Sequence, residues 1–184
     1  MKIIGITGTL GSGKGTIVDY LTKYKGFIHF SVRGYLTKLI RAKGLEVNRD
    51  TMVAEANELR AKNSPSFIVE ELYHEALQSG KDCIIESIRT VGEIHALRGK
   101  GNFHLFAVDA DQQVRYQRIV ERASETDFIS FETFQANEAR EMNATDPNKQ
   151  NLSACMKLAD FCFDNNGSFD DLYKHIDTVL QQIH

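Results

Sequence analysis

The residues best suited to chemistry lie in a glycine-rich segment near the start of the chain. Gly8, Gly13 and Lys14 satisfy the spacing G-x-x-x-x-G-K, after an apolar run at residues 2–7 and at the start of a helical pattern. Glycines allow successive backbone N–H groups to point at one anion, and the helix N-terminus and the lysine add positive charge. This segment therefore predicts a loop that binds the phosphates of ATP. The predicted phosphate-binding residues are Gly8, Thr9, Gly11, Ser12, Gly13, Lys14, Gly15 and Thr16.

A carboxylate ends a second buried strand pattern. Glu86 follows the apolar run Cys83-Ile84-Ile85, in the position of an acid that orders the water shell of Mg²⁺ near the phosphates. The alternative is an acidic residue that only faces solvent. Arg89 follows within reach of the same edge, since ligands of open α/β sheets bind at the carboxyl ends of the strands. The pattern favours a functional cluster there.

Basic residues dominate the segment from residue 20 to residue 45, which contains no acid. Most of them suit a solvated helix face. Arg33 differs, because it follows a strand pattern and begins a helix, where a cation opposes the helix dipole unless an anion is near. A phosphate acceptor needs only positioning, whereas a hydroxyl acceptor needs a base within hydrogen-bond reach. The segment favours an anionic acceptor at Arg33, although Glu86 is a candidate base for a hydroxyl.

Two arginines form a pair on a predicted helix at residues 114–122. Arg118 and Arg122 lie four residues apart on one face, with Arg115 on the same side. Arginines directed at a triphosphate would neutralise the charge that spreads over the phosphoryl oxygens during transfer. The alternative is ordinary salt bridging with nearby glutamates. Arg140, on the next predicted helix, is a weaker candidate for the same site.

Alternating strand and helix patterns must position these residues. Apolar runs predict strands at residues 2–7, 27–31, 82–86, 103–109 and 159–164. Helical spacing between them indicates parallel pairing, with helices on both faces of one sheet. Predicted helix N-termini lie at Asn48, Ser64 with Pro65 in the first turn, Ser130 and Ser168.

We therefore predict a three-layer α/β P-loop NTPase fold with a five-stranded parallel sheet. It is expected to be a single domain over residues 1–184, with acceptor-side helices at about 33–80 and a short lid at about 123–130.

The composition excludes several classes of protein. The 184 residues are 42% hydrophobic and 26% charged, the balance of a folded chain, and the net charge of −3 does not attract nucleic acid or anionic membrane. No apolar stretch reaches the length of a signal peptide or a membrane span. Cys83, Cys155 and Cys162 form no CxxC pair and are expected to be buried free thiols. We expect a cytoplasmic protein with a small-molecule substrate.

Several blocks resemble nucleotide kinases. The form Gly-Lys-Gly-Thr at residues 13–16 is similar to that of adenylate kinases. This implies that Mg²⁺ is held mainly through water and that Thr16 contacts an inner phosphate. The block Q-R-I-V-E-R at residues 117–122 resembles the helix before the lid of nucleoside-monophosphate kinases. That resemblance implies Arg118 over the adenine and Arg122 at the transferred phosphoryl group.

Two further resemblances concern the ends of the site. Ala159-Asp160 and the stretch D-N-N-G-S at residues 164–168 are similar to the closing segment of dephospho-CoA kinases, which implies Asn165 beside the adenine. The blocks N-E-L-R at 57–60 and E-S-I-R at 86–89 resemble archaeal adenylate-kinase-related proteins, over nearly the whole chain. We expect Arg33, Arg60 and Arg89 to position the acceptor.

The departures from these families fall on the acceptor side. Gly34 and Thr37 stand where monophosphate kinases place an Asp and an Arg, and Glu86-Ser87 replaces their Asp-Gly. The expected reaction is Mg²⁺-dependent phosphoryl transfer from ATP to a small nucleotide-like acceptor, with Lys14, Arg118, Arg122 and Glu86 as catalytic residues. Two alternatives stay open: a dephospho-CoA-type kinase acting on a ribose hydroxyl, and a regulatory protein that binds or hydrolyses ATP.

Overall fold

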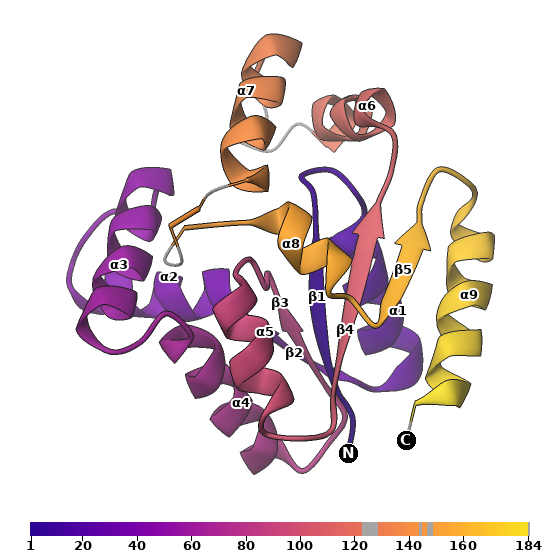
Figure 1. The fold of residues 1–184 in the computed structure, drawn as a ribbon, viewed down its shortest axis with the longest axis horizontal. Helices are drawn as coiled ribbons and strands as arrows, with labels where there is room; N and C mark the ends of the chain where they lie inside the picture. The colour runs from indigo at the N-terminus through magenta and orange to yellow at the C-terminus, as the bar shows by residue number, and fades with distance from the viewer. Residues whose placement is uncertain (123–128, 144, 147–148, 184) are drawn as a thin grey trace.

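The computed structural model describes residues 1–122, 129–143, 145–146 and 149–183. In these residues five strands form one parallel sheet in the order β2-β3-β1-β4-β5 (Figure 1). The strands are β1 (Ile3–Gly8), β2 (Ile28–Ser31), β3 (Cys83–Glu86), β4 (Phe103–Asp109) and β5 (Phe161–Asp164). All five predicted strands are confirmed, and their bounds shift by two residues at most.

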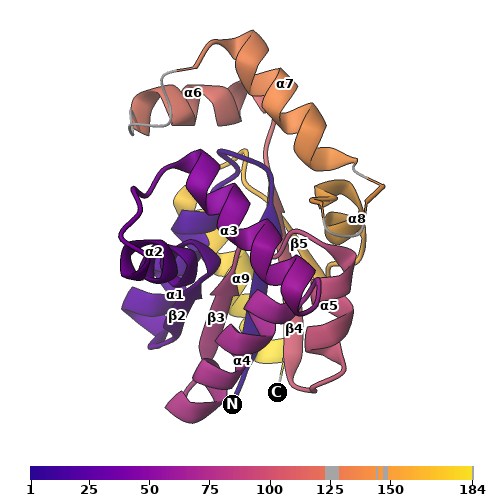
Figure 2. The same cartoon turned by 90° about the vertical axis from the view of Figure 1, so that its left-hand side faces the viewer.

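Helices cover both faces of this sheet, which confirms the predicted three-layer α/β fold. They are α1 (Lys14–Lys25), α2 (Val32–Ala42), α3 (Arg49–Lys62), α4 (Phe67–Ser79), α5 (Val91–Arg98), α6 (Gln112–Arg122), α7 (Phe131–Met142), α8 (Leu152–Lys157) and α9 (Phe169–Gln182). Helices α1 and α9 pack on one face, and α4, α5 and α8 on the other, with α2 and α3 beside α4. Helices α6 and α7 lie beyond the carboxyl ends of the strands (Figures 1 and 2).

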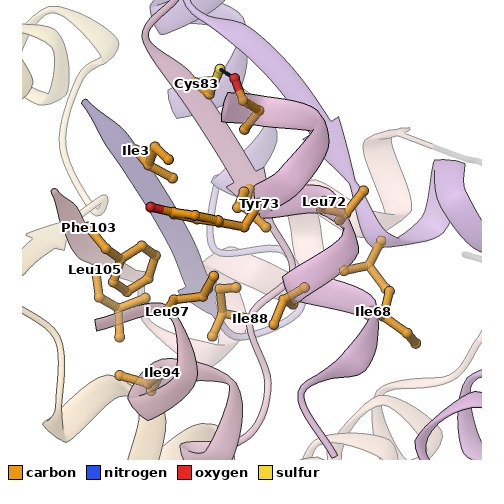
Figure 3. Packing of buried hydrophobic residues seen from close by; sticks show 14 of the residues in the cluster. Ile3, Ile68, Leu72, Tyr73, Cys83, Ile88, Ile94, Leu97, Phe103 and Leu105 are labelled. Atoms are coloured by element: carbon orange, nitrogen blue, oxygen red, sulfur yellow. Dashed lines mark hydrogen bonds between the residues drawn. The ribbon is translucent and has the colours of Figure 1, made fainter. Parts of the chain in front are cut away.

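Successive residues of a strand point to opposite faces of the sheet, and helices cover both faces of the central strands β1, β3 and β4. In β1, Ile3 belongs to the apolar cluster with α4 and α5, whereas Ile4 belongs to the cluster with α1 and α9. Figure 3 shows the first cluster, in which the ring of Tyr73 from α4 points toward Ile3 and Phe103 of the sheet. This alternation anchors each strand, so the loops at the strand ends are held in place.

Most helix starts are confirmed, and one is wrong in detail. The side chains of Asn48, Ser130 and Ser168 each cap a helix as predicted. Helix α4 begins at Phe67 rather than after Ser64, because residues 64–66 form a turn in which Phe67 N donates to Ser64 O (3.1 Å). The short helices α5 and α8 were not predicted.

Three smaller expectations concern the cysteines, a membrane span and the lid. Cys83 and Cys155 are buried as expected, but Cys162 is exposed, so that part of the prediction is wrong. None of the helices in the described ranges has the length and apolar character needed to cross a membrane. Of the predicted lid at about 123–130, residues 123–128 lie outside the described residues.

Candidate functional site

The predicted phosphate loop connects the end of β1 to the start of α1, at the carboxyl edge of the sheet (Figure 1). Gly13 is the N-cap of α1 and has a φ of 105°, and Gly8 has a φ of 146°. A Cβ at Gly8 would collide with the carbonyl oxygen of Val108, and one at Gly13 with the side-chain amide of Asn165. Only glycine fits these two positions, which explains the spacing in the sequence.

The side chain of Lys14 folds back onto the predicted phosphate loop. Its Nζ donates to the carbonyl oxygens of Gly8 (2.8 Å) and Thr9 (2.7 Å). Burial and the nearby guanidinium of Arg89 lower the pKa of Lys14 to about 8, although Glu86 and other carboxylates act in the opposite direction. Burial destabilises the charged ammonium group of Lys14, and anionic phosphate oxygens bound at the loop would offset that cost.

Side chains from the end of β4, from the residue after β5 and from α6 hydrogen-bond to the loop. Asp109, at the end of β4, accepts from Thr9 Oγ1 (2.6 Å). Asn165, just after β5, donates from Nδ2 to Ser12 O (2.8 Å). Arg115 donates from Nη1 to Leu10 O (3.3 Å). These three contacts preorganise the loop backbone.

Arg118 and Asn165, both predicted at the ATP site, lie side by side. Arg118 Nη2 donates to Asn165 O (2.7 Å). In the described part of the chain, buried polar atoms without a protein partner include Ser12 Oγ, Asn165 Oδ1 and Arg118 Nη1. Such atoms are costly to bury unless a ligand or water satisfies them. A bound nucleotide fits this set of residues.

Glu86 is brought to the same edge, at the end of β3. Its Oε2 lies 3.0 Å from His29 Nε2 of β2. Burial opposes ionisation, but the His29 hydrogen bond and the charges of Lys14 and Arg89 outweigh it, so the pKa of Glu86 is lowered. A carboxylate that stays ionised here fits a water-mediated Mg²⁺ contact, with Thr16 at the first turn of α1 as the second candidate.

The backbone after Glu86 adopts an uncommon conformation. Ser87 has a φ of 75°, and its N–H, like that of Ile88, donates to Ile6 O (3.1 Å). A glycine adopts this conformation without steric cost, which accounts for the Asp-Gly that the resembling kinases carry here. The turn directs the chain toward Arg89.

Arg89, just after this turn, has polar partners from later segments of the chain. Its Nη1 donates to Gln150 Oε1 (2.6 Å) and lies 3.6 Å from Glu141 Oε2 of α7. Arg89 also acts electrostatically on both Lys14 and Glu86.

The other two predicted acceptor residues, Arg60 and Arg33, differ from Arg89 in their burial and their partners. Arg60 is mostly buried, and its Nη2 lies 3.2 Å from Oε1 of Glu93 in α5. Arg33 is exposed in the first turn of α2. Arg122, predicted on the donor side, is exposed at the end of α6 and acts electrostatically on Lys14. Arg140 is exposed and donates to the side chain of Asn137 in its own helix.

Three of the six lysines and arginines at residues 20–45 form ion pairs in the described part of the chain. Lys23 pairs with Asp19, and Lys25 pairs with Asp177 of α9. Lys43 pairs with Glu55 of α3 (2.6 Å) and with Glu58. Arg33, on which the expectation of an anionic acceptor depends, is exposed at the start of α2, so that expectation stays a prediction.

Four participants were not predicted: Asp109, Glu138, Glu141 and His29. Asp109 gives the same signal as Glu86, an acid that ends an apolar strand. Glu138 lies 2.6 Å from Arg115 Nη2. Arg115, expected beside Arg118, is buried, and its Nε also donates to Ala110 O (2.7 Å). The sequence around Glu138 and Glu141 in α7 does not predict their ion pairs, because their partners are distant along the chain.

Known proteins resemble this chain over its full length. A UPF0200 protein from Methanococcus maripaludis is 25% identical over 186 residues, covering 100% of this chain and 98% of the relative. The crystal structure of a Thermus thermophilus protein matches with a TM-score of 0.62 and 22% identity, covering 100% of this chain and 98% of the other. Dephospho-CoA kinase from Campylobacter jejuni matches with a TM-score of 0.57 and 17% identity, covering 99% and 97%.

The structural likenesses establish the fold, that of P-loop kinases. The family follows from the sequence itself, because the AAA domain matches residues 4–143. That range holds the phosphate loop, Glu86, Arg89 and the helix with Arg118 and Arg122. Since the match spans well over half of the 184 residues, this protein belongs to the AAA domain family of P-loop NTPases.

Proposed function

We propose that this protein transfers the γ-phosphoryl group of ATP to a small nucleotide or nucleotide-like acceptor. One observation carries the proposal: Lys14 joins two groups of residues. On one side it contacts the phosphate loop at Gly8 and Thr9. On the other, Glu86 at the end of β3 and Arg89 just after it act electrostatically on its ammonium group. A donor site and a second polar site thus meet at one ammonium group.

Each donor-side residue has a role that suits its position. The loop amides and Lys14 hold the phosphates, while Arg118 and Asn165 lie where the nucleotide would be enclosed. Arg122 supports the charge of the transferred group. Mg²⁺, when bound, neutralises charge on the β- and γ-phosphates, and Glu86 and Thr16 would order its water shell.

The acceptor would bind between β3 and the helices α2 and α3. Arg89 acts electrostatically on Lys14, and Arg33 lies in the first turn of α2. Arg60 is held by Glu93, so it would act on the acceptor through the position of α3. The kinase fold of the Campylobacter jejuni enzyme supports phosphoryl transfer as the reaction class.

Substitution of Lys14 tests the proposal. With γ-labelled ATP, Mg²⁺ and a panel of nucleosides, nucleoside monophosphates and dephospho-CoA, the wild-type protein should label at least one acceptor. Lys14→Ala should lower that rate at least a thousandfold, because it removes a charge that stabilises the transferring group. Lys174→Ala, at an exposed position of α9, is the matched control and should retain full activity.

Two results would oppose the proposal. Near-normal transfer by Lys14→Ala would contradict the donor site. Tight ATP binding without labelling of any acceptor would favour the regulatory ATP-binding alternative.

A further inference from the structure

Arg115 is a buried cation that connects the phosphate loop to helix α7. Its Nη2 lies 2.6 Å from Oε1 of Glu138, and its guanidinium carbon lies 5.6 Å from the ring centre of Phe134. Its Nε donates to Ala110 O (2.7 Å), in the turn between β4 and α6, and its Nη1 donates to Leu10 O (3.3 Å). One side chain therefore joins the loop, this turn and α7.

The contact with Leu10 fixes the orientation of one peptide unit in the loop. In a planar trans peptide unit the C=O and the following N–H point in opposite directions. The carbonyl of Leu10 points toward Arg115 in α6, so the N–H of Gly11 points away from α6. Within the described ranges no residue accepts a hydrogen bond from this N–H. It is therefore available to a phosphate oxygen.

The loop backbone also packs closely against α6. A Cβ at Gly11 would lie 2.5 Å from the backbone carbonyl oxygen of Arg115. On the other side of the loop, Asn165 Nδ2 donates to Ser12 O (2.8 Å), which orients the N–H of Gly13 by the same rule. Two peptide units of the loop are thus each oriented by a side chain from outside it.

Glu138 determines where the guanidinium of Arg115 lies. Arg115 also has a second carboxylate neighbour, Asp109, whose Oδ1 is 3.5 Å from Nε. Because the side chain of Glu138 is 12% exposed and that of Asp109 is 47% exposed, solvent screens the pair with Glu138 less. Without Glu138 the guanidinium would be attracted toward Asp109. Its alignment with Leu10 O, the longer of its two hydrogen bonds to carbonyls, would then be lost.

We propose that Arg115 is a positioning residue for the phosphate loop, and that Glu138 of α7 keeps it in place. The inference rests on the loop being the donor site of the proposed kinase. Arg115 acts through the peptide unit of Leu10 and Gly11, and Glu138 acts through Arg115. Removal of the negative charge of Glu138 therefore lowers the affinity for an anion. A Coulomb effect alone has the opposite sign.

Calorimetry with inorganic tripolyphosphate tests this sign. The dissociation constant should be about fivefold higher for Glu138→Gln than for the wild type, because the Gly11 amide is no longer aligned with the anion. Glu132→Gln is the matched control, since it removes an exposed carboxylate from the same helix, and it should bind at least as tightly as the wild type. If Glu138→Gln binds as tightly as Glu132→Gln, the proposal is wrong.

Arg115→Lys separates position from charge. Lysine keeps the positive charge but lacks the planar fork that bonds Ala110 O, Leu10 O and Glu138 together. Its dissociation constant for tripolyphosphate should be about tenfold higher than that of the wild type. Arg98→Lys is the control, because Arg98 also donates to a carbonyl and pairs with a carboxylate, Asp160, before β5 at the opposite edge of the sheet. It should bind as the wild type does.

The amide resonance of Gly11 reports the orientation directly. In ¹H–¹⁵N spectra it should move downfield when tripolyphosphate is added to the wild type, and it should move less in Arg115→Lys and Glu138→Gln. A loss of stability alone would not produce this difference in protein that urea denaturation shows to be folded. An equal shift in all three proteins would overturn the proposal, even where the affinities differ.

Failure of the positioning role and failure of the kinase function give different results. If the wild type binds neither tripolyphosphate nor MgATP, the donor site is wrong, and both proposals fall. If the wild type and both variants bind tripolyphosphate equally, only the positioning role is refuted. The binding comparison is decided whether or not any acceptor is phosphorylated.

Discussion

At the scale of single residues, the site depends on how charge is placed around the ammonium group of Lys14. Its Nζ is bonded to two loop carbonyls and surrounded by Arg89, Glu86, Glu141 and other charges. Burial and the positive charge of Arg89 disfavour protonation of Lys14 in the free protein. A bound polyphosphate would favour the protonated form. The same residue therefore links nucleotide affinity to pH.

This link predicts that ATP binding weakens in mild alkali. The pKa of Lys14 is lowered to about 8 in the free protein, and bound phosphates would raise it again. The ammonium form is present below pH 8 and is lost above it, so binding above pH 8 requires proton uptake. The dissociation constant for MgATP should be about fivefold higher at pH 9 than at pH 8. Calorimetry across this range measures it.

The Lys14→Arg variant provides the comparison, because a guanidinium does not titrate between pH 7 and pH 9. Its affinity for MgATP should stay level over that interval. An equally level profile for the wild type would contradict the assignment of this pKa to nucleotide binding.

At the scale of elements, buried ion pairs connect helices that carry the two halves of the site. Glu93 in the first turn of α5 pairs with Arg60 of α3 and accepts from the backbone N–H groups of Arg89 (2.8 Å) and Thr90 (3.0 Å). It therefore holds both the turn that presents Arg89 and the helix behind the acceptor side. Glu138 connects α7 to Arg115, and through it to the phosphate loop.

Loss of the Glu93 charge should destabilise the fold. Glu93→Gln leaves the mostly buried guanidinium of Arg60 without its counter-ion, which costs about 3 kcal/mol in the free energy of unfolding. Urea denaturation measures this loss. Adding Arg60→Met to Glu93→Gln should restore part of the stability, since no unpaired buried charge remains. A single variant as stable as the exposed control Glu75→Gln would show that the pair contributes nothing.

At the scale of the whole molecule, the nucleotide is expected to stabilise the folded protein. The phosphate loop is braced by Asp109 of β4 and Asn165 after β5, so its geometry exists only when the sheet is formed. A ligand at one hundred times its dissociation constant adds about 2.7 kcal/mol. For a chain of this size the melting temperature should rise by roughly 5 to 10 °C.

Thermal unfolding with and without MgATP measures this shift. Lys14→Ala should abolish most of it, whereas Lys174→Ala should retain it. A wild-type protein whose melting temperature does not respond to saturating MgATP would contradict the assignment of the loop as a nucleotide site.

The sequence by itself determined the parts of this protein that depend on local patterns. Apolar runs placed all five strands, and most clearly the central strands β1, β3 and β4, because a strand buried on both faces needs continuous apolar residues. The loop at Gly8–Lys14 was identifiable because positive φ angles and close approaches require glycine at fixed spacing. Glu86 was placed at the site for a similar reason, since it ends a buried strand.

Only the tertiary structure decided which charges meet. Glu141 and Arg89, or Glu93 and Arg60, are separated by 52 and 33 residues (141 − 89 and 93 − 60), and no local rule relates them. Whether a charge is available for a substrate depends on partners that folding brings close, and Coulomb energy depends on distance in space. For that reason the donor loop could be predicted from the sequence, whereas the acceptor side required the structure.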